Sequence, residues 1–367
     1  MWNRALSDRR MKRAWRAFKQ GSPQDVRKSI ACLPSEEGLE TMGGKWLGRL
    51  VSRDDMGTPL MVAARSNSAP AVSCLLEAGA QVNACDSEFG LTPLMCAALG
   101  NTEEVISLLL GAGATVNARC RFGNSPLLTA VHYNSPEVAT RLLAAGAELE
   151  VCNKRGRRPL MQAAANNKPE VVSVLLSAGA DVDARIPDPC ELPGSTALHL
   201  AGISDHPEVV SLLLEAGARL EARDDQGRTP LCHAARVATR PEIISILCQS
   251  GARIGVRDQS RKSPLMHAAK ENPDVSIIER LIILGANVNA RCSMGRTALM
   301  YAAWQTRTPG VLQLLLHRGA KAKLESKDGK TALDYIRHNR HGGFYGVDKG
   351  EFKESAVYLE LRGATLY

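Results

Sequence analysis

Histidine and cysteine are the residues of this sequence best suited to chemistry, and neither forms a recognised reactive pattern. The ten cysteines include no Cys-x-x-Cys pair, so their spacing does not suit a zinc site or a dithiol redox centre. The eight histidines are scattered, and the chain contains no His-Glu-x-x-His helix, glycine-rich phosphate loop or Gly-x-Ser-x-Gly turn. The sequence therefore predicts a protein that is not an enzyme and has no cofactor or catalytic metal.

Four residues come closest to a reactive arrangement. His233 and His267 lie 34 residues apart in similar surroundings and are expected to stack. Because no carboxylate occupies the same place, we expect ordinary helix packing there and not a metal pair. Cys120 and Cys292 would need a base and an orienting group beside them to act as nucleophiles, so we interpret them as replaced turn residues.

A repeat of 33 or 34 residues accounts for most of the chain. Its first marker is Thr or Ser, once Arg, followed by Pro-Leu or Ala-Leu, and one step lengthens to 38 residues. Its second marker is Gly-Ala after a leucine-rich run, with the same period until a final step of 44. Two independent markers with one period predict stacked supersecondary units. The first marker begins at Thr58, Thr92, Ser125, Arg158, Thr196, Thr229, Ser263, Thr297 and Thr331.

Each unit carries signals for two short helices. Thr or Ser suits the N-cap and Pro the first turn of the first helix, and paired alanines let neighbouring helices approach closely. Pro-Glu opens many second helices, and the glycine of Gly-Ala suits the C-cap. Since such a unit cannot bury its own apolar face, it must stack on its neighbours. Turn residues suited to a left-handed conformation lie between the helices at Asn67, Asn134, Asn167, Asp205 and Asn272.

Thr-Pro-Leu-x-x-Ala-Ala, Leu-Leu-x-x-Gly-Ala and Val-Asn-Ala at this period resemble ankyrin repeats over about residues 51–367. The resemblance implies an all-α repeat solenoid, an ankyrin-type stack of helix-turn-helix units joined by β-hairpin-like loops. It comprises about nine full repeats plus a degenerate N-terminal one. The family's histidine after Pro-Leu is present only as His199, so we expect fewer inter-repeat hydrogen bonds. Methionine takes its place at Met61, Met95, Met161, Met266 and Met300.

We predict three segments. Residues 1–50 form a basic helix, a degenerate capping repeat and a loop; residues 51–324 form eight ankyrin-type repeats; residues 325–367 form a C-terminal capping repeat with an insertion. Two insertions break the period, at 186–193 and 340–350. Insertions in repeat arrays map to loops, often on the binding face, and for residues 186–193 a neutral loop extension remains an equal alternative. The insertion at 340–350 splits the last unit.

Stacking turns equivalent positions into surface columns. The residue that follows the hairpin glycine position lies where ankyrin-like proteins tend to contact partners, and it is basic at Arg157, Arg228, Lys262, Arg296 and Lys330. First-helix ends and hairpin tips add ring-bearing and apolar anchors at Phe122, His132, Tyr133, Met294 and Trp304. These ten residues are the predicted partner-binding site. A second column is interpreted mainly as solvated family consensus and comprises Arg119, Arg185, Arg223, Arg257 and Arg291.

The leading functional interpretation is a monomeric scaffold or adaptor that binds a partner protein through the concave groove and hairpin tips. The basic columns favour a partner with an acidic or amphipathic segment. We expect Arg228→Glu combined with Arg296→Glu to abolish capture while melting stays near wild type. Two alternatives remain: a binder of nucleic acid or anionic membrane through the N-terminal segment, and a bacterial effector directed to a host cell. Residues 1–50 hold eleven basic and five acidic side chains.

Hydropathy and cysteine use favour a cytoplasmic protein. No stretch reaches the roughly 20 apolar residues of a membrane span, and the basic N-terminus lacks the apolar region of a secretory signal. Peripheral membrane contact, secretion into a host and an arginine-rich mitochondrial presequence remain as alternatives.

Overall fold

The computed structural model describes residues 16–17, 22–31, 57–100, 103–133, 135–166, 168–305 and 309–339. These residues are helical with connecting turns, and no strand occurs among them. The all-α repeat solenoid is thereby confirmed. The predicted loop at 34–50 and the insertion at 340–350 lie outside the described residues, as does most of the basic N-terminal segment.

Each repeat consists of two short antiparallel helices. The first helices are α5 (Pro59–Arg65), α7 (Pro93–Gly100), α9 (Pro126–His132), α11 (Pro159–Asn166), α13 (Ala197–Ser204), α15 (Pro230–Val237), α17 (Pro264–Glu271), α19 (Ala298–Gln305) and α21 (Ala332–Asn339). The second helices are α6 (Ala69–Glu77), α8 (Glu103–Gly111), α10 (Pro136–Ala144), α12 (Pro169–Ser177), α14 (Pro207–Glu215), α16 (Pro241–Gln249), α18 (Val275–Ile283) and α20 (Pro309–His317). A further helix, α3 (Pro23–Ala31), packs against α6. None of these helices has the length and apolar run that crossing a membrane requires.

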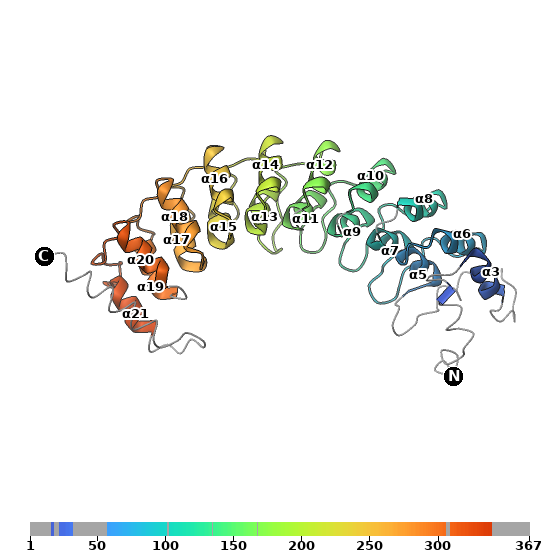
Figure 1. Cartoon of the computed structure of the whole chain (residues 1–367), viewed down its shortest axis with the longest axis horizontal. Coiled ribbons are helices and arrows are strands. Elements are labelled where there is room, and N and C mark those ends of the chain that lie inside the picture. Colours follow the sequence, from blue (N-terminus) through green and yellow to red (C-terminus); the bar gives the residue numbers. More distant parts are fainter. Residues whose placement is uncertain are drawn as a thin grey trace. The chain divides into compact units, whose positions relative to one another are not determined.

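The chain forms two compact units. Unit 1 comprises residues 1–163 and 170–181, and unit 2 comprises residues 164–169 and 182–367. In unit 2, helices α13, α15, α17, α19 and α21 pack side by side as one row, and α14, α16, α18 and α20 form a second row (Figure 1). In unit 1, α5, α7 and α9 form the first row and α6, α8 and α10 the second (Figure 1).

The first helices begin with the same capping hydrogen bond, and three different side chains act as its acceptor. In the repeat of α13, the N–H of Thr196 donates to Nδ1 of His199 at 3.1 Å. In the repeat of α5, Sδ of Met61 accepts from the N–H of Thr58 at 3.3 Å, and in that of α21 a carboxylate oxygen of Asp334 takes the same place. The helix start therefore tolerates the loss of histidine. The imidazole of His199 also donates through Nε2 to the carbonyl of Arg228 at 3.1 Å, a bond that a thioether cannot make.

Alanine pairs and leucines make up the core. Ala63 and Ala64 of α5 are fully buried, as is Leu75 of α6. Small alanine side chains let the first helices of neighbouring repeats lie close together, so each repeat is covered by the next. The second helices end at glycines with positive φ, such as Gly79 at +81°, which confirms the predicted glycine caps.

The predicted left-handed turn residues behave differently. Asn67 and Asp205 have φ of 59° and 64°, as expected. Asn272 does not, since its φ is −95°. It is buried, and its Nδ2 donates to the carbonyls of Ala235 and Ala238 in the preceding repeat, so it joins two repeats and does not form a tight turn. The placements of residues 134 and 167 lie outside the described residues.

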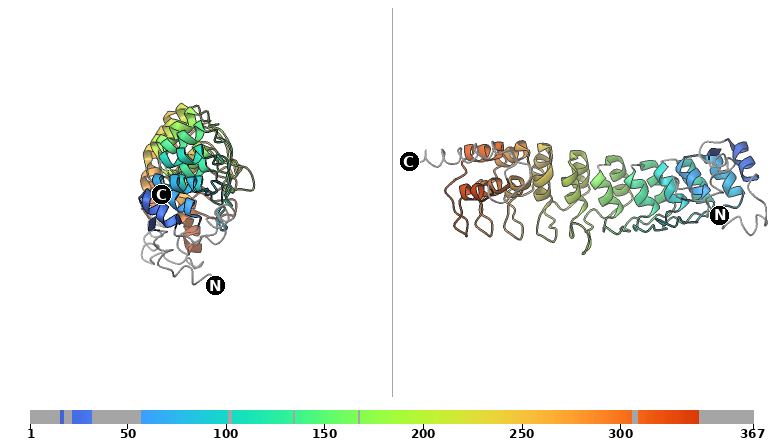
Figure 2. Two further views of the ribbon diagram at one scale, coloured as in Figure 1. Left: turned by 90° about the vertical axis from the view of Figure 1, so that its right-hand side faces the viewer. Right: turned by 90° about the horizontal axis from the view of Figure 1, so that it is seen from below.

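Hairpin-like loops connect successive repeats and are themselves linked. In one such loop the N–H of Asp224 donates to the carbonyl of Arg228 at 2.9 Å, and the N–H of Gln259 in the next loop donates to the carbonyl of Gln226 at 3.1 Å. These loops project from one side of the helices of unit 2 (Figure 2). The insertion at 186–193 lengthens one of them, and the carbonyl of Pro193 accepts from the N–H of Asp225 at 3.1 Å. The insertion is therefore tied into the row of loops.

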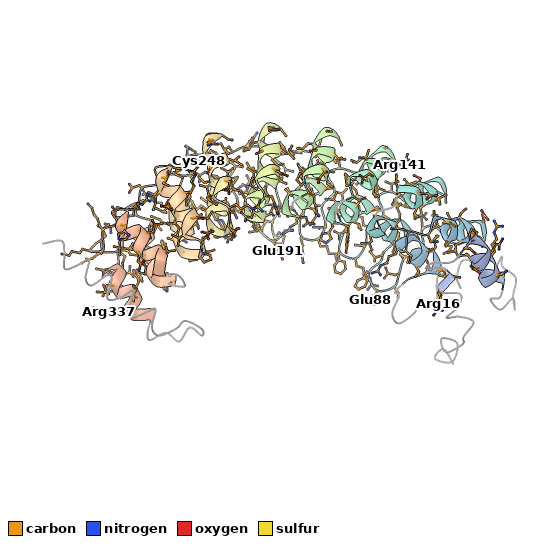
Figure 3. The ribbon with its side chains drawn as sticks, in the orientation of Figure 1. Arg16, Glu88, Arg141, Glu191, Cys248 and Arg337 are labelled. Atoms are coloured by element: carbon orange, nitrogen blue, oxygen red, sulfur yellow. The ribbon has the colours of Figure 1, made fainter. Side chains whose placement is uncertain are left out.

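The loop edge and the second-helix edge are separate surfaces. In unit 2, Glu191 marks the loop edge, and Cys248 on α16 marks the other (Figure 3). In unit 1, Glu88 marks the loop edge, and Arg141 on α10 marks the second-helix edge (Figure 3).

Candidate functional site

Arg228, a predicted contact residue, has a largely covered side chain in unit 2. Its side chain is only 11% exposed, and its Nε donates to a carboxylate oxygen of Asp224 at 2.8 Å. The same oxygen accepts from Nε2 of His233 at 2.9 Å, and the other oxygen accepts two backbone N–H groups. Although burial opposes ionisation of Asp224, the bonds from His233 and Arg228 hold its pKa well below the usual value. Arg228 therefore neutralises a buried carboxylate, and its reversal cannot leave the fold unchanged.

The contact between Asp224 and His233 recurs in each of the next three repeats with different residues. It joins two side chains nine residues apart, the first in the hairpin and the second in the following helix. Asp258 meets His267 at 3.0 Å, Cys292 meets Tyr301 at 3.5 Å, and Ser326 meets Tyr335 at 3.3 Å. The expectation that no carboxylate faces His233 and His267 was wrong, and the nine-residue spacing was the signal that could have revealed the pairs.

His199 and His233 are interior groups of unit 2, and burial favours their neutral forms. His233 contacts His199 edge to face, with ring centroids 5.4 Å apart, where stacking between His233 and His267 was predicted. Burial lowers the pKa of His199 to about 4 and also lowers the pKa of His233. Among the residues that the structure describes, no group of three or more His, Cys, Asp and Glu side chains could hold a metal ion.

Cys96 and Cys232 are buried thiols and poor nucleophiles. Burial raises the pKa of Cys96 to about 12 and that of Cys232 to about 11, so both remain protonated at neutral pH. Cys292 is buried, and its sulfur accepts from the hydroxyl of Tyr301. Cys120 is buried as well, and its N–H donates to the carbonyl of Asn124 across the hairpin, as a turn residue does.

The second arginine column binds repeat to repeat. Arg223 donates from Nη1 to the carbonyl of Gly227 in its own hairpin at 2.7 Å and to that of Arg257 in the next repeat at 2.8 Å. Arg257 repeats this arrangement with the carbonyls of Arg261 and Arg291. This column therefore has a structural role that its interpretation as solvated consensus missed.

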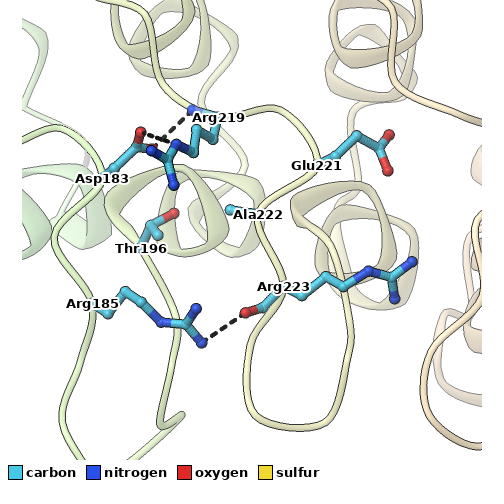
Figure 4. Close-up of a pocket in the computed structure, with 7 residues that line it drawn as sticks. All are labelled: Asp183, Arg185, Thr196, Arg219, Glu221, Ala222 and Arg223. Atoms are coloured by element: carbon cyan, nitrogen blue, oxygen red, sulfur yellow. Dashed lines mark hydrogen bonds and ion pairs between the residues drawn. The ribbon is translucent and has the colours of Figure 1, made fainter.

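A cavity of about 440 Å³ lies along this column in unit 2. In Figure 4 the guanidinium of Arg219 points to Asp183 and that of Arg185 to the carbonyl of Arg223. Glu221 at its edge pairs with Arg253 at 3.1 Å. The charged groups that line the cavity thus already have partners in their own or neighbouring repeats, and the arrangement is that of a seam between repeats. The lining residues are Asp183, Arg185, Thr196, Arg219, Glu221, Ala222 and Arg223.

Arg296 and Trp304 meet in a cluster at the C-terminal part of unit 2, together with Tyr335 of the next repeat. The guanidinium carbon of Arg296 lies 4.9 Å from the centroid of Trp304 and 5.3 Å from that of Tyr335. Nε of Arg296 donates to the hydroxyl of Tyr335 at 2.8 Å, and Nη2 lies 3.6 Å from Asp328. Trp304 is 41% exposed, whereas Arg296 is 19% exposed. We call Arg296, Trp304 and Tyr335 the tryptophan cluster.

Two further predicted residues of unit 2 occupy equivalent places in the repeats on either side of Arg296. Nζ of Lys262 lies 5.7 Å from the ring centroid of Tyr301, the counterpart of the contact between Arg296 and Tyr335. Lys330 is half-buried, and its N–H donates to Oγ of Ser326. Met294 is exposed at the hairpin tip, two residues before Arg296. The tryptophan cluster is therefore accompanied by basic and apolar side chains.

The remaining predicted residues belong to unit 1. Phe122 is exposed and stacks on Phe89 of the preceding loop, with ring centroids 5.8 Å apart. Tyr133 is exposed at the end of α9 and contacts the ring of His132 edge to face at 4.9 Å. Arg157 is half-buried in its hairpin, where its N–H donates to Asn153. The ten predicted residues thus divide into four in unit 1 and six in unit 2.

Comparisons with known proteins agree with this architecture. The family model for ankyrin repeats in three copies matches residues 45–120, 100–186, 183–258 and 254–328. The crystal structure of the human ASB11 ankyrin repeat domain is similar, with 28% sequence identity and a TM-score of 0.56, over 63% of this chain and 99% of that chain. No curated protein is significantly similar to this chain. Because the family model covers most of its length, the chain belongs to the ankyrin-repeat family.

Proposed function

We propose that this protein is a non-enzymatic adaptor that binds a partner protein through the tryptophan cluster of unit 2. Ankyrin repeats are generally protein–protein interaction modules, and stacked repeats offer extended surfaces for that purpose. The exposed side chain of Trp304, which packs beside Arg296 and Tyr335, is the observation that carries the proposal.

Trp304 has the properties of an interface anchor. A partner that covered its exposed face would gain the burial of a large apolar side chain. Arg296 and Tyr335 pack beside the indole, so it is already held in place and would lose little conformational entropy on binding. An anchor of this kind typically dominates the affinity of an interface.

The charges around the cluster favour an acidic or amphipathic segment. Lys262 and Lys330 are partly exposed in the two neighbouring repeats, while the nearby carboxylate of Asp328 is already paired with Arg296. A carboxylate of the partner would therefore meet a net positive surface.

The test is capture of a partner by the full-length chain, followed by titration of the purified partner. Trp304→Ala is expected to weaken binding by about tenfold or more. Val237→Ala is the matched control, since Val237 at the end of α15 is 39% exposed, and it should leave binding unchanged. Lys330→Glu should weaken binding and reduce its salt dependence. If Trp304→Ala binds the partner with unchanged affinity, the tryptophan cluster is not part of the interface.

A reducing, cytoplasmic setting and a monomeric state complete this proposal. The cysteines that the structure describes are all free thiols, which is the usual state in a reducing compartment.

The basic segment at residues 1–50 supports a second candidate function, the binding of nucleic acid or anionic membrane. Deletion of residues 1–20 should then abolish a binding that weakens steeply with salt.

A further inference from the structure

Two hairpin tips of unit 1 carry an aromatic pair that the core does not use. Phe122 is 56% exposed and stacks on the half-buried ring of Phe89, with an angle of 26° between the two ring planes. The pair comes from consecutive loops, so it exists only because the repeats are stacked. Large apolar side chains in such exposed positions often mark contact surfaces.

Exposed basic residues occupy the second of these two loops and the next one. Arg121 and Arg155 are exposed, and neither has a carboxylate within ion-pair distance among the residues that the structure describes. The stem of Arg121 lies against Gly90, because a Cβ added to that glycine would be 3.5 Å from Cγ of Arg121. Of the acidic residues that adjoin the pair in these loop tips, Glu88 is exposed, whereas Asp86 is buried and its carboxylate accepts backbone N–H groups of its own loop. The rim of the aromatic pair is therefore net positive.

The backbone of these tips is already occupied. The carbonyl of Phe89 accepts from the N–H of Arg121 at 2.7 Å, and the carbonyl of Phe122 accepts from the N–H of Lys154 at 2.9 Å. The N–H groups of Glu88 and Phe89 donate to the carboxylate of Asp86. A ligand would therefore be recognised by side chains, through an apolar contact and a charge, and not by the addition of a β-strand.

We infer that these tips form a second protein-binding surface, which takes an acidic segment that presents a large apolar side chain. The apolar side chain would cover the exposed face of Phe122, and flanking carboxylates would face Arg121 and Arg155. The surface belongs to unit 1 and uses none of the residues of the tryptophan cluster. It goes beyond the proposed function in giving the adaptor a second partner site.

The probe is a random peptide library displayed on phage, selected on the full-length Trp304→Ala variant so that the tryptophan cluster is disabled. Selected peptides are expected to combine Asp or Glu with Phe, Leu or Trp. Synthetic copies should bind wild type and lose affinity by about tenfold or more in Phe122→Ala and in Arg121→Glu with Arg155→Glu. Ile283→Ala is the matched control, because Ile283 on α18 is 58% exposed and lies in unit 2. Thermal melting should match wild type in each of these variants.

Each other outcome contradicts the inference. Failure to select peptides, peptides without acidic residues, or affinities unchanged in Phe122→Ala would remove this surface from consideration. Exposed aromatic and basic side chains also suit single-stranded nucleic acid, so an oligothymidylate is titrated in parallel. If the oligonucleotide binds in a Phe122-dependent manner and peptides do not, the ligand is a nucleic acid and the assignment to a protein segment fails.

Discussion

The residue in each hairpin and the residue that it meets nine positions later change together along unit 2. Asp224 meets a histidine, whereas Cys292 and Ser326 meet tyrosines. Cysteine and serine are smaller than aspartate, and the longer tyrosine reaches across the space that they leave. A carboxylate instead benefits from the N–H of an imidazole and needs a cation, which Arg228 supplies for Asp224.

This pairing predicts that Arg228→Glu destabilises the fold. The variant would place two carboxylates together in the interior, and the free energy of unfolding should fall by about 3 kcal/mol. Lys330→Glu changes the equivalent position in a repeat whose hairpin residue is the uncharged Ser326, so it should have little effect on the free energy of unfolding. Urea unfolding of the two variants measures the difference, and equal stabilities would contradict the structural role of Arg228. Lys330 is therefore a better position for charge reversal than Arg228, whereas Lys262 lies beside the buried Asp258 and shares the constraint on Arg228.

His199 should make stability depend on pH. Burial and the adjacent His233 lower its pKa from 6.5 to about 4. Between these values the unfolded chain binds a proton that the folded chain does not, so the free energy of unfolding falls as the pH falls from 6.5 to 4. The expected loss is about 3 kcal/mol at pH 4. His199→Gln should flatten this dependence in urea unfolding measured across the range, and an unchanged slope would count against the assignment.

The segments that follow the second helices form a ladder of polar side chains. Asn289 donates from Nδ2 to the carbonyl of Gly319 at 2.9 Å and accepts from the N–H of Lys321 at 2.8 Å. Asn83 and Asn117 make the same two bonds to the repeats that follow them. In other repeats a carboxylate at this position accepts the bond from the backbone N–H of the next repeat. Gly255 occupies this position in the repeat of α16 and has no side chain to contribute.

Gly255→Asn is therefore expected to stabilise the protein. A Cβ added at Gly255 meets nothing within 4 Å, and its φ lies outside the left-handed region that disfavours other residues. Two added hydrogen bonds to the next repeat and the loss of glycine's freedom in the unfolded chain should contribute about 1–2 kcal/mol. Gly255→Ala isolates the backbone effect and should give less than half of the gain. If the melting temperature of Gly255→Asn is no higher than that of Gly255→Ala, the asparagine does not form the two expected hydrogen bonds.

At the scale of the whole molecule, stability is expected to be local, because each repeat packs only on its neighbours. Leu281 of α18 is fully buried between α16 and α20, so Leu281→Ala should cost about 3 kcal/mol. Hydrogen exchange should accelerate in α16, α18 and α20, while amides of α5, α7 and α9 in unit 1 keep their protection. Uniform acceleration in both units would show instead that the chain unfolds as one cooperative body.

The sequence alone determined the helices, their order and the period of the stack. Caps such as Thr58, the alanine pairs and the terminal glycines act within a few residues, so their types and spacing carry the local structure. Two of the residues that the sequence singled out as contact candidates, Phe122 and Trp304, are exposed in the structure, and their role in binding stays a prediction.

Only the tertiary structure decided which basic residues are available to a partner. Arg228 and Lys330 share one column, yet the guanidinium of Arg228 pairs with the buried carboxylate of Asp224, whereas the hairpin residue beside Lys330 is the uncharged Ser326. The tryptophan cluster likewise depends on a contact across 39 residues, between Arg296 and Tyr335. The exposure of a charged side chain depends on which residue of the hairpin or of the next repeat lies opposite it, and repeat position alone does not reveal that partner.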